Sequence, residues 1–172
     1  MQEAELEKIV TEYSPFVWKI CYRLVGNHAD AEDCFQETFI SMMDVIRRQK
    51  IRSTKAMLIR LATNKSIDRL RQRSRKSEPV SIPEHLEIVG NDRSPVQGVE
   101  SKELAEQLRT ALVQLSAQEA AAFCMRYLNE LDYGRIASEL GTKRNNARVL
   151  VHRAKGKLSQ LLTGVGIDEV LK

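Results

Sequence analysis

Apolar residues recur every three or four positions along the first 76 residues, the spacing of one face of an α-helix. Three such stretches occupy residues 9–24, 30–46 and a segment from residue 53 or 54 to about 75. Asp30 is expected to cap the second helix, because its carboxylate can accept hydrogen bonds from the free amides of a first turn. Nothing in this part of the chain alternates as a strand does, so it is predicted to be helical.

The helical spacing resumes over residues 104–115. Ser116, followed three residues later by Glu119, is a capping box that predicts the start of another helix. That helix is expected to carry Ala122, Phe123, Met125 and Tyr127. A short helix is predicted between Asp132 and Gly141, because aspartate caps helix starts and glycine commonly ends them.

Residues 77–98 show no sustained helical period and contain three of the four prolines and two of the eight glycines. This composition is typical of a linker. We therefore predict an all-α protein of two small helical domains joined by a flexible acidic linker. The predicted boundaries are 1–76 for the first domain, 77–99 for the linker, 100–165 for the second domain and 166–172 for a C-terminal tail.

Composition narrows the class of protein. With 42% hydrophobic residues and a net charge of +4, the 172-residue chain can bury a core, which excludes a disordered or collagen-like chain. No run approaches the ~18 apolar residues of a membrane span, and the start is acidic where a secretion signal is basic and apolar, so we expect a soluble cytoplasmic protein. Cys21, Cys34 and Cys124 form no CxxC pair and are expected to be reduced and buried.

No arrangement of residues argues for an enzyme. The three histidines, His28, His85 and His152, lie far apart in the sequence, and the chain has neither an HExxH motif nor a glycine-rich phosphate loop. The cysteine and histidine spacings do not match a zinc site. We therefore expect no catalytic residue, no metal and no cofactor.

The charge is unevenly distributed along the chain. Residues 1–50 carry a net −3, whereas residues 51–76, with nine basic side chains and one acidic, carry +8. Residues 77–107 carry −5, and residues 131–160 carry +5. Two basic blocks around an acidic stretch are typical of two contact zones on one polyanion. Charge alone leaves open the alternative of two solvated helix faces.

The second basic block has the plan of a helix-turn-helix: a short helix, a turn at residues 141–143 and a helix from about residue 143 to 162. Four apolar residues spaced four, three and four apart define the inward face of the last helix: Ala147, Val151, Ala154 and Leu158. The opposite face and its flank can contact a DNA major groove through Arg144, Asn145, Arg148, Val149, His152 and Arg153. A basic, solvated helix closing a bundle is the alternative.

The first basic block lies on the predicted third helix. Its basic side chains, with Asn64 beside them, include Arg60, Lys65, Arg69, Arg71, Arg73, Arg75 and Lys76. Such a segment suits a phosphate backbone, and Asn64 can bond a presented base edge. Charges that complement the helix's own dipole are the alternative, which accounts for two or three of them.

Three segments in this order resemble a known family: DAEDCFQETF over residues 30–39, AMLIRLATNKSIDRLRQR over residues 56–73, and the helix-turn-helix segment over residues 115–158. Together they are similar to bacterial RNA polymerase sigma factors of the extracytoplasmic-function group. The resemblance covers nearly the whole chain outside the linker and the last ten residues. A lone helix-turn-helix is shared by many regulators, whereas both domains in this order are highly specific.

The resemblance implies partners and residue roles. The second helix would dock on the largest subunit of core RNA polymerase through Asp30, Glu32, Asp33, Gln36 and Glu37. The minus-ten promoter element and its opened strand would be contacted by Arg60, Asn64, Lys65, Asp68, Arg69 and Arg71. The minus-thirty-five element would be read by Arg144, Asn145, Arg148, Val149, His152 and Arg153. Members of the group are commonly restrained by an anti-sigma factor, and the free protein is expected to be a monomer.

Two positions depart from the family pattern. Met57 stands where a tryptophan is common, and no aromatic residue occurs between Phe39 and Phe123, so strand opening is expected to rely on polar and aliphatic residues. Val149 and Leu150 occupy places that are Ser and Arg in many relatives, which puts one DNA contact in question.

Two other interpretations of the function are a stand-alone helix-turn-helix regulator and an all-α interaction module that never touches DNA.

Overall fold

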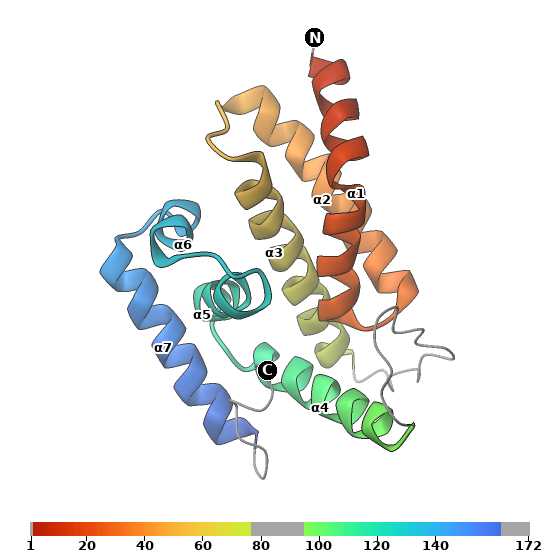
Figure 1. The fold of residues 1–172 in the computed structure, drawn as a ribbon, viewed down its shortest axis with the longest axis vertical. Helices are drawn as coiled ribbons and strands as arrows, with labels where there is room; N and C mark the ends of the chain where they lie inside the picture. Colours follow the sequence, from red (N-terminus) through yellow and green to blue (C-terminus); the bar gives the residue numbers. More distant parts are fainter. Residues whose placement is uncertain (1, 77–94, 163–172) are drawn as a thin grey trace.

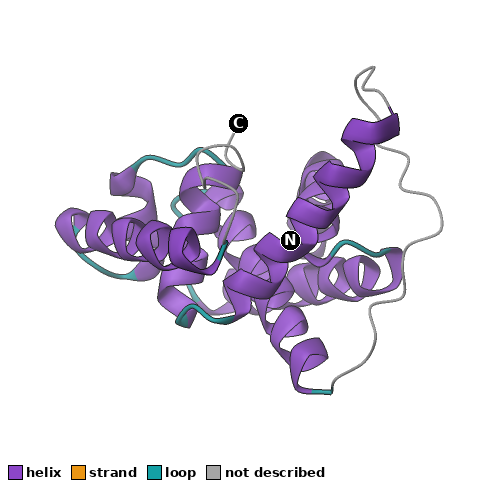
Figure 2. Cartoon of the chain, turned by 90° about the horizontal axis from the view of Figure 1, so that it is seen from below, coloured by secondary structure: helices purple, strands orange, loops and turns teal. Residues whose placement is uncertain are grey.

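The computed structural model describes residues 2–76 and 95–162, which form helices joined by short turns (Figure 1). No strand occurs among the described residues (Figure 2), and the prediction of an all-α protein with two helical regions is confirmed. None of the described helices is long and apolar enough to cross a membrane. The predicted tail and most of the predicted linker lie outside the described residues.

The first region is a bundle of three helices: α1 (Gln2–Val25), α2 (His28–Arg48) and α3 (Thr54–Arg75). Each packs on the other two around a core of fully buried side chains, among them Val17, Met42, Leu58 and Ile67. Gly26 makes the turn between α1 and α2 with φ +79°, a left-handed conformation that glycine adopts without a steric penalty. The long α3 therefore lies with one side against α1 and α2.

The start of α2 differs from the prediction. The N-cap is Asn27, whose side-chain oxygen accepts from the Asp30 amide at 2.9 Å, and the helix begins at His28. Asp30 is the cap that the sequence predicts, but it lies in the first turn, so its carboxylate is free for other contacts. The start of α3 is as predicted: Ser53 caps it by accepting from the Ala56 amide at 3.3 Å.

The second region comprises α4 (Pro95–Val113), α5 (Ala117–Phe123), η1 (Cys124–Leu128), α6 (Tyr133–Leu140) and α7 (Arg144–Leu161). The capping box of Ser116 and Glu119 is present in both directions, and Asp132 caps α6. Gly141 ends α6 in the left-handed conformation, as predicted. The structure differs from the prediction at Pro95, where α4 begins inside the expected linker, because proline is well tolerated in a first helical turn.

The helix predicted after Ser116 changes type. Beyond Phe123 it continues as the π-helix η1, in which the Asn129 amide and side-chain nitrogen both donate to the Cys124 carbonyl at 3.2 Å. Glu130 follows in a left-handed conformation with φ 56°, an arrangement that ends the helix without a glycine. Apolar periodicity does not distinguish an α-helix from a single π-turn, so the sequence carried no signal for this change.

The two regions pack directly on each other. Helix α3 contacts α4, α5, η1 and α6, and the buried side chains form one continuous cluster from Ile9 to Leu162. In Figure 1, α3 lies between the α1–α2 pair and the second region. The sequence predicted two domains but no contact between them.

All three cysteines are unpaired and buried, as expected. Burial raises the pKa of Cys21 to about 11 and the pKa values of Cys34 and Cys124 to about 12. Because the thiolate is the reactive species, we expect the folded chain to resist alkylation by iodoacetamide at pH 8. Mass spectrometry should find three modified thiols after unfolding, and rapid modification of the native chain would contradict the burial.

Candidate nucleic-acid interface

Helix α7 separates its side chains into a buried row and an exposed row. Its inward residues, Ala147, Val151, Ala154 and Leu158, are at most 2% exposed. The exposed side carries the six residues predicted to contact a major groove: Arg144, Asn145, Arg148, Val149, His152 and Arg153. Val149 is 41% exposed, one of the few large apolar side chains in the described residues that face solvent. The structure therefore brings these six residues together on one open helix face.

The turn before α7 fixes how this helix projects from the domain. Gly141 allows the chain to reverse, and the Thr142 amide donates to the Ala137 carbonyl at 2.9 Å. The side-chain amide of Asn146 donates to the Thr142 hydroxyl at 2.6 Å. Helices α6 and α7 pack closely, as in a helix-turn-helix, in which the second helix enters the major groove.

The expectation for Leu150 is corrected. Leu150 is only 8% exposed and belongs to the core, so it does not stand on the open face of α7. An arginine at this position in a relative would have to leave the core or extend along it. The departure at Leu150 therefore concerns packing, whereas the one at Val149 lies on the open face.

The six residues of α3 predicted to contact the minus-ten element are divided among different surroundings. Asn64 and Asp68 are exposed. Lys65 lies 3.6 Å from a Glu37 carboxylate oxygen, and Arg69 pairs with α2 more closely, at 2.6 Å from an Asp30 carboxylate oxygen. Two of the six, Lys65 and Arg69, thus contact acidic residues of the neighbouring helix.

Arg60 and Arg71 contact the second region instead. Arg60 Nη1 donates to the Glu139 carbonyl of α6 at 2.8 Å, and Arg71 Nη2 donates to the Leu115 carbonyl at 3.0 Å. Both arginines therefore bind the backbone of the second region in this structure. No local pattern in the sequence indicates these contacts, because they join residues 79 and 44 positions apart.

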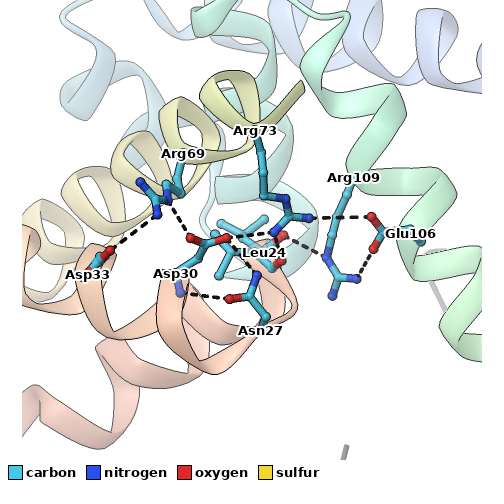
Figure 3. Close-up of polar contacts among 9 residues, drawn as sticks. Leu24, Asn27, Asp30, Asp33, Arg69, Arg73, Glu106 and Arg109 are labelled. Carbon is cyan, nitrogen blue, oxygen red and sulfur yellow. Dashed lines mark hydrogen bonds and ion pairs between the residues drawn. The ribbon is translucent and has the colours of Figure 1, made fainter. Parts of the chain in front are cut away.

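The acidic residues predicted on α2 also divide. Glu32, Asp33, Gln36 and Glu37 are exposed and form an open face, whereas Asp30 is 7% exposed. Asp30 accepts from Arg69 Nε at 2.6 Å, from Arg73 Nη1 at 3.0 Å and from the Asn27 side chain at 2.8 Å (Figure 3). Asp30 therefore joins α2 to α3 and is not available on the surface.

Two opposing effects set the pKa of Asp30. Burial by itself would raise this pKa, but the hydrogen bonds from Asn27, Arg69 and Arg73 outweigh it and hold the pKa below its usual value. The carboxylate is thus charged at neutral pH. Arg69, which pairs with Asp30, also lies 3.5 Å from the exposed carboxylate of Asp33.

A network that the sequence did not predict extends from Asp30 to the second region (Figure 3). Arg73 lies between the carboxylates of Asp30 and Glu106, at 3.0 and 3.7 Å. Glu106 in turn pairs with Arg109 at 3.0 Å. The network therefore links α2, α3 and α4.

The same arginines satisfy the C-terminus of α1. Arg109 donates to the Leu24 carbonyl at 2.9 Å and to the Arg23 carbonyl at 3.1 Å, and Arg73 donates to the Val25 carbonyl at 2.9 Å. The last carbonyls of a helix have no partner within the helix, and cationic side chains suit its negative end. No local pattern in the sequence indicates this role of Arg109, because the two carbonyls that it binds lie 85 and 86 positions away.

Met57 is buried at 8% exposure. It therefore packs in the core of the first region and presents no surface on which a base could stack. Among the described residues, no group of three histidine, cysteine, aspartate or glutamate side chains could hold a metal ion.

Two family models match this chain. Sigma-70 region 2 matches residues 9–76, and Sigma-70 region 4 matches residues 100–158. The chain is 29% identical over 156 residues to the ECF RNA polymerase sigma factor SigE of Mycolicibacterium smegmatis, covering 91% of this chain and 61% of that relative, less than two thirds of its length. It is 27% identical over 162 residues to the ECF RNA polymerase sigma factor SigW of Bacillus subtilis, covering 90% of this chain and 87% of that relative.

A solved structure has a similar fold. It is the sigma factor RpoE in complex with the anti-sigma factor NepR, from Bartonella quintana, with a TM-score of 0.58 and 20% sequence identity. The match covers 93% of this chain and 98% of that chain. At this identity, the likeness supports the arrangement of helices.

Proposed function

Because this chain belongs to the extracytoplasmic-function group of the sigma-70 family, we infer that it directs core RNA polymerase to specific promoters and assists strand opening there. The observation that carries this function is the open, basic face of α7 in the same chain as a region 2 bundle. The chain acts in the cytoplasm without chemistry of its own, since the polymerase forms the bonds. A stand-alone regulator is not favoured, because it leaves the region 2 match without a role.

Region 4 reads the minus-thirty-five element through the open face of α7. Arginine can donate two hydrogen bonds to guanine, asparagine can pair with adenine, and valine can contact a thymine methyl group. Arg148, Asn145 and Val149 supply these three chemistries on adjacent turns. Arg144, His152 and Arg153 lie beside them and suit the flanking phosphates.

Region 2 serves two partners from neighbouring helices. The open face of α2, formed by Glu32, Asp33, Gln36 and Glu37, binds the polymerase, while Asp30 acts from beneath by holding α2 against α3. The minus-ten element is contacted from the exposed side of α3 by Asn64 and Asp68. Lys65 joins them once DNA replaces Glu37, and Arg69 once DNA replaces Asp33, while the bond from Arg69 to Asp30 is kept.

Arg60 and Arg71 can contact the minus-ten element only after region 4 moves away, because both bind its backbone in this structure. The free chain is then a closed monomer that opens on the polymerase. An anti-sigma factor that stabilises the closed arrangement would restrain it. Support for such a partner comes from the fold shared with a sigma factor crystallised with its anti-sigma factor.

Run-off transcription tests the proposed function. Core RNA polymerase is incubated with a library of genomic fragments, with and without the purified chain. We expect transcripts from a defined subset of promoters only when the chain is present. The same transcripts in its absence, or none in either case, would contradict the function.

Arg148→Ala tests the reading face. On the promoters recovered by run-off transcription, Arg148→Ala should lose about 1–3 kcal/mol of discrimination at one base pair of the upstream element, because a bidentate base contact is removed. Arg75→Ala, an equal loss of charge at the exposed end of α3, is the control and should weaken all sequences alike. Unchanged base preference in Arg148→Ala would remove α7 from this role.

Asp33→Lys tests the polymerase face. We expect the Asp33→Lys chain to bind core polymerase more weakly, since the substitution reverses a charge on the open face of α2. Transcription should therefore fall at every promoter. Glu5→Lys on α1 makes the same change of charge on an exposed residue elsewhere and should bind as the parent does. Affinity measured by sedimentation or by fluorescence anisotropy distinguishes the two, and equal affinity would show that the α2 face is merely solvated.

A further inference from the structure

Tyr133 lies beneath the open face of α7, where its ring is close to Arg148. It is the first residue of α6, directly after the N-cap Asp132, and its half-buried ring packs against the core. The guanidinium carbon of Arg148 is 5.4 Å from the centre of this ring, and that of Arg126 is 4.7 Å away. Both distances fall within the range of cation–π attraction. One aromatic ring thus contacts an arginine of η1 and an arginine of α7.

The ring is held in place by its surroundings. Arg126, on the π-helix η1, also donates through Nη1 to the Leu131 carbonyl at 3.1 Å, which fixes its guanidinium close to the turn before α6. Asp132 accepts from the Arg135 amide at 2.9 Å and thereby fixes the first turn of α6. The ring of Tyr133 therefore belongs to a rigid part of region 4, whereas Arg148 lies on the exposed side of α7.

A long, exposed arginine samples many rotamers, and binding a base in one of them costs conformational entropy. A ring that already favours one direction of the guanidinium lowers this cost and leaves the donors on its edge free for hydrogen bonds. The benefit is confined to the base pair that Arg148 contacts. A residue that acts in this way changes sequence preference at one position rather than affinity at all of them.

We propose that Tyr133 is a positioning residue for promoter recognition: its ring orients Arg148 before DNA binds and so sets the preference at the base pair that Arg148 reads. The proposal rests on the proposed function, in which α7 reads the upstream promoter element. Tyr133 itself touches no base in this role. The ring face is what matters, so phenylalanine can replace tyrosine and leucine cannot.

The test uses the full chain bound to core RNA polymerase and a pool of promoter fragments randomised in the upstream element. Tyr133→Leu should reduce the preference for one base by two- to fivefold, or about 0.4–1 kcal/mol at 1.4 kcal/mol per tenfold, at the base pair affected by Arg148→Ala. Tyr133→Phe should keep the parental preference. In the Arg148→Ala background, Tyr133→Leu should cause no further change at that base pair.

Tyr127→Leu is the matched control. Tyr127 is a half-buried ring of the same region that contacts Phe123 and lies 6.0 Å from Lys155 Nζ, so its loss perturbs packing without removing the ring under Arg148. A uniform loss across all sequences in Tyr133→Leu, equal to that in Tyr127→Leu, would overturn the positioning role. If Arg148→Ala leaves base preference unchanged, the reading role of α7 fails and the inference fails with it. If only Arg148→Ala changes the preference, the inference alone is wrong.

Discussion

Asp30→Ala is expected to lower the free energy of unfolding by about 3 kcal/mol, the loss typical of removing one partner from a buried ion pair. Asp30 is nearly buried and accepts from Arg69, Arg73 and Asn27. Without its carboxylate, two guanidinium groups lose their closest anion. Arg73 keeps Glu106 and the Val25 carbonyl, which limits the damage. Urea unfolding followed by circular dichroism measures the change.

Asp33→Ala is the matched control for this prediction. Asp33 also lies near Arg69, at 3.5 Å, but its side chain is 57% exposed. A pair in water contributes little, so we expect a change within about 0.5 kcal/mol. Equal effects of the two substitutions would show that burial of Asp30 does not matter to its contribution.

The free energy of unfolding should depend on pH in part through the titration of Asp30. Its pKa is lower in the folded chain than in the unfolded chain, so the stabilisation is complete above the unfolded pKa of about 4 and is lost as the pH falls through the folded pKa. Glu119 also contributes stability that is lost in acid, because the hydrogen bond from Lys157 lowers its pKa against the opposing effect of burial. Asp30→Asn should therefore flatten part of the acid limb between pH 5 and the folded pKa. An unchanged limb would contradict the lowered pKa.

Gly26→Ala is expected to cost about 2–3 kcal/mol and to loosen the contact between regions 2 and 4. The left-handed backbone at Gly26 accounts for part of the cost. In addition, a Cβ at this position would lie 2.5 Å from the guanidinium carbon of Arg109. Arg109 can move aside, but it then loses its hydrogen bonds to the Leu24 and Arg23 carbonyls.

Two variants separate these effects. Arg109→Met keeps the backbone of Gly26 and removes the contacts of Arg109 with the end of α1 and with Glu106. Gly156→Ala is the control for the same type of substitution: it changes a helical glycine with open space around it and should raise stability by up to about 1 kcal/mol. Fluorescent labels on cysteines introduced at the exposed positions Glu5 and Ser159 report the separation of the regions. We expect longer distances in Gly26→Ala and Arg109→Met only. An unchanged distance in both would show that Arg109 does not hold the regions together.

Prediction from the sequence succeeded where the cause is local. The capping box at Ser116, the Asp132 cap and the stop at Gly141 each depend on residues within a few positions of one another, and each is present. Prediction failed at the start of α2, where both Asn27 and Asp30 can cap. Asn27 is the cap because the carboxylate of Asp30 instead accepts hydrogen bonds from two arginines of α3, which lie some 40 residues away in the sequence.

The candidate site shows the same division. The open face of α7 follows from apolar spacing alone, so its six residues are identifiable from the sequence by itself. The six residues of α3 could not be sorted in this way. Their environments depend on what packs against each side of the helix, and charge patterning cannot tell a DNA contact from a contact with Glu139 or Glu37.

By itself, the sequence determined the all-α class, the two regions, most helix limits and the exposed basic face of α7, because periodicity, caps and turns are properties of neighbouring residues. Only the tertiary structure decided that the two regions share a core, that Asp30 is buried and that Arg60, Arg71 and Arg109 bind backbone carbonyls across the chain. It also placed the Tyr133 ring beneath Arg148. Such contacts join residues far apart in sequence, and no local pattern encodes which of several arginines will meet which carbonyl or ring.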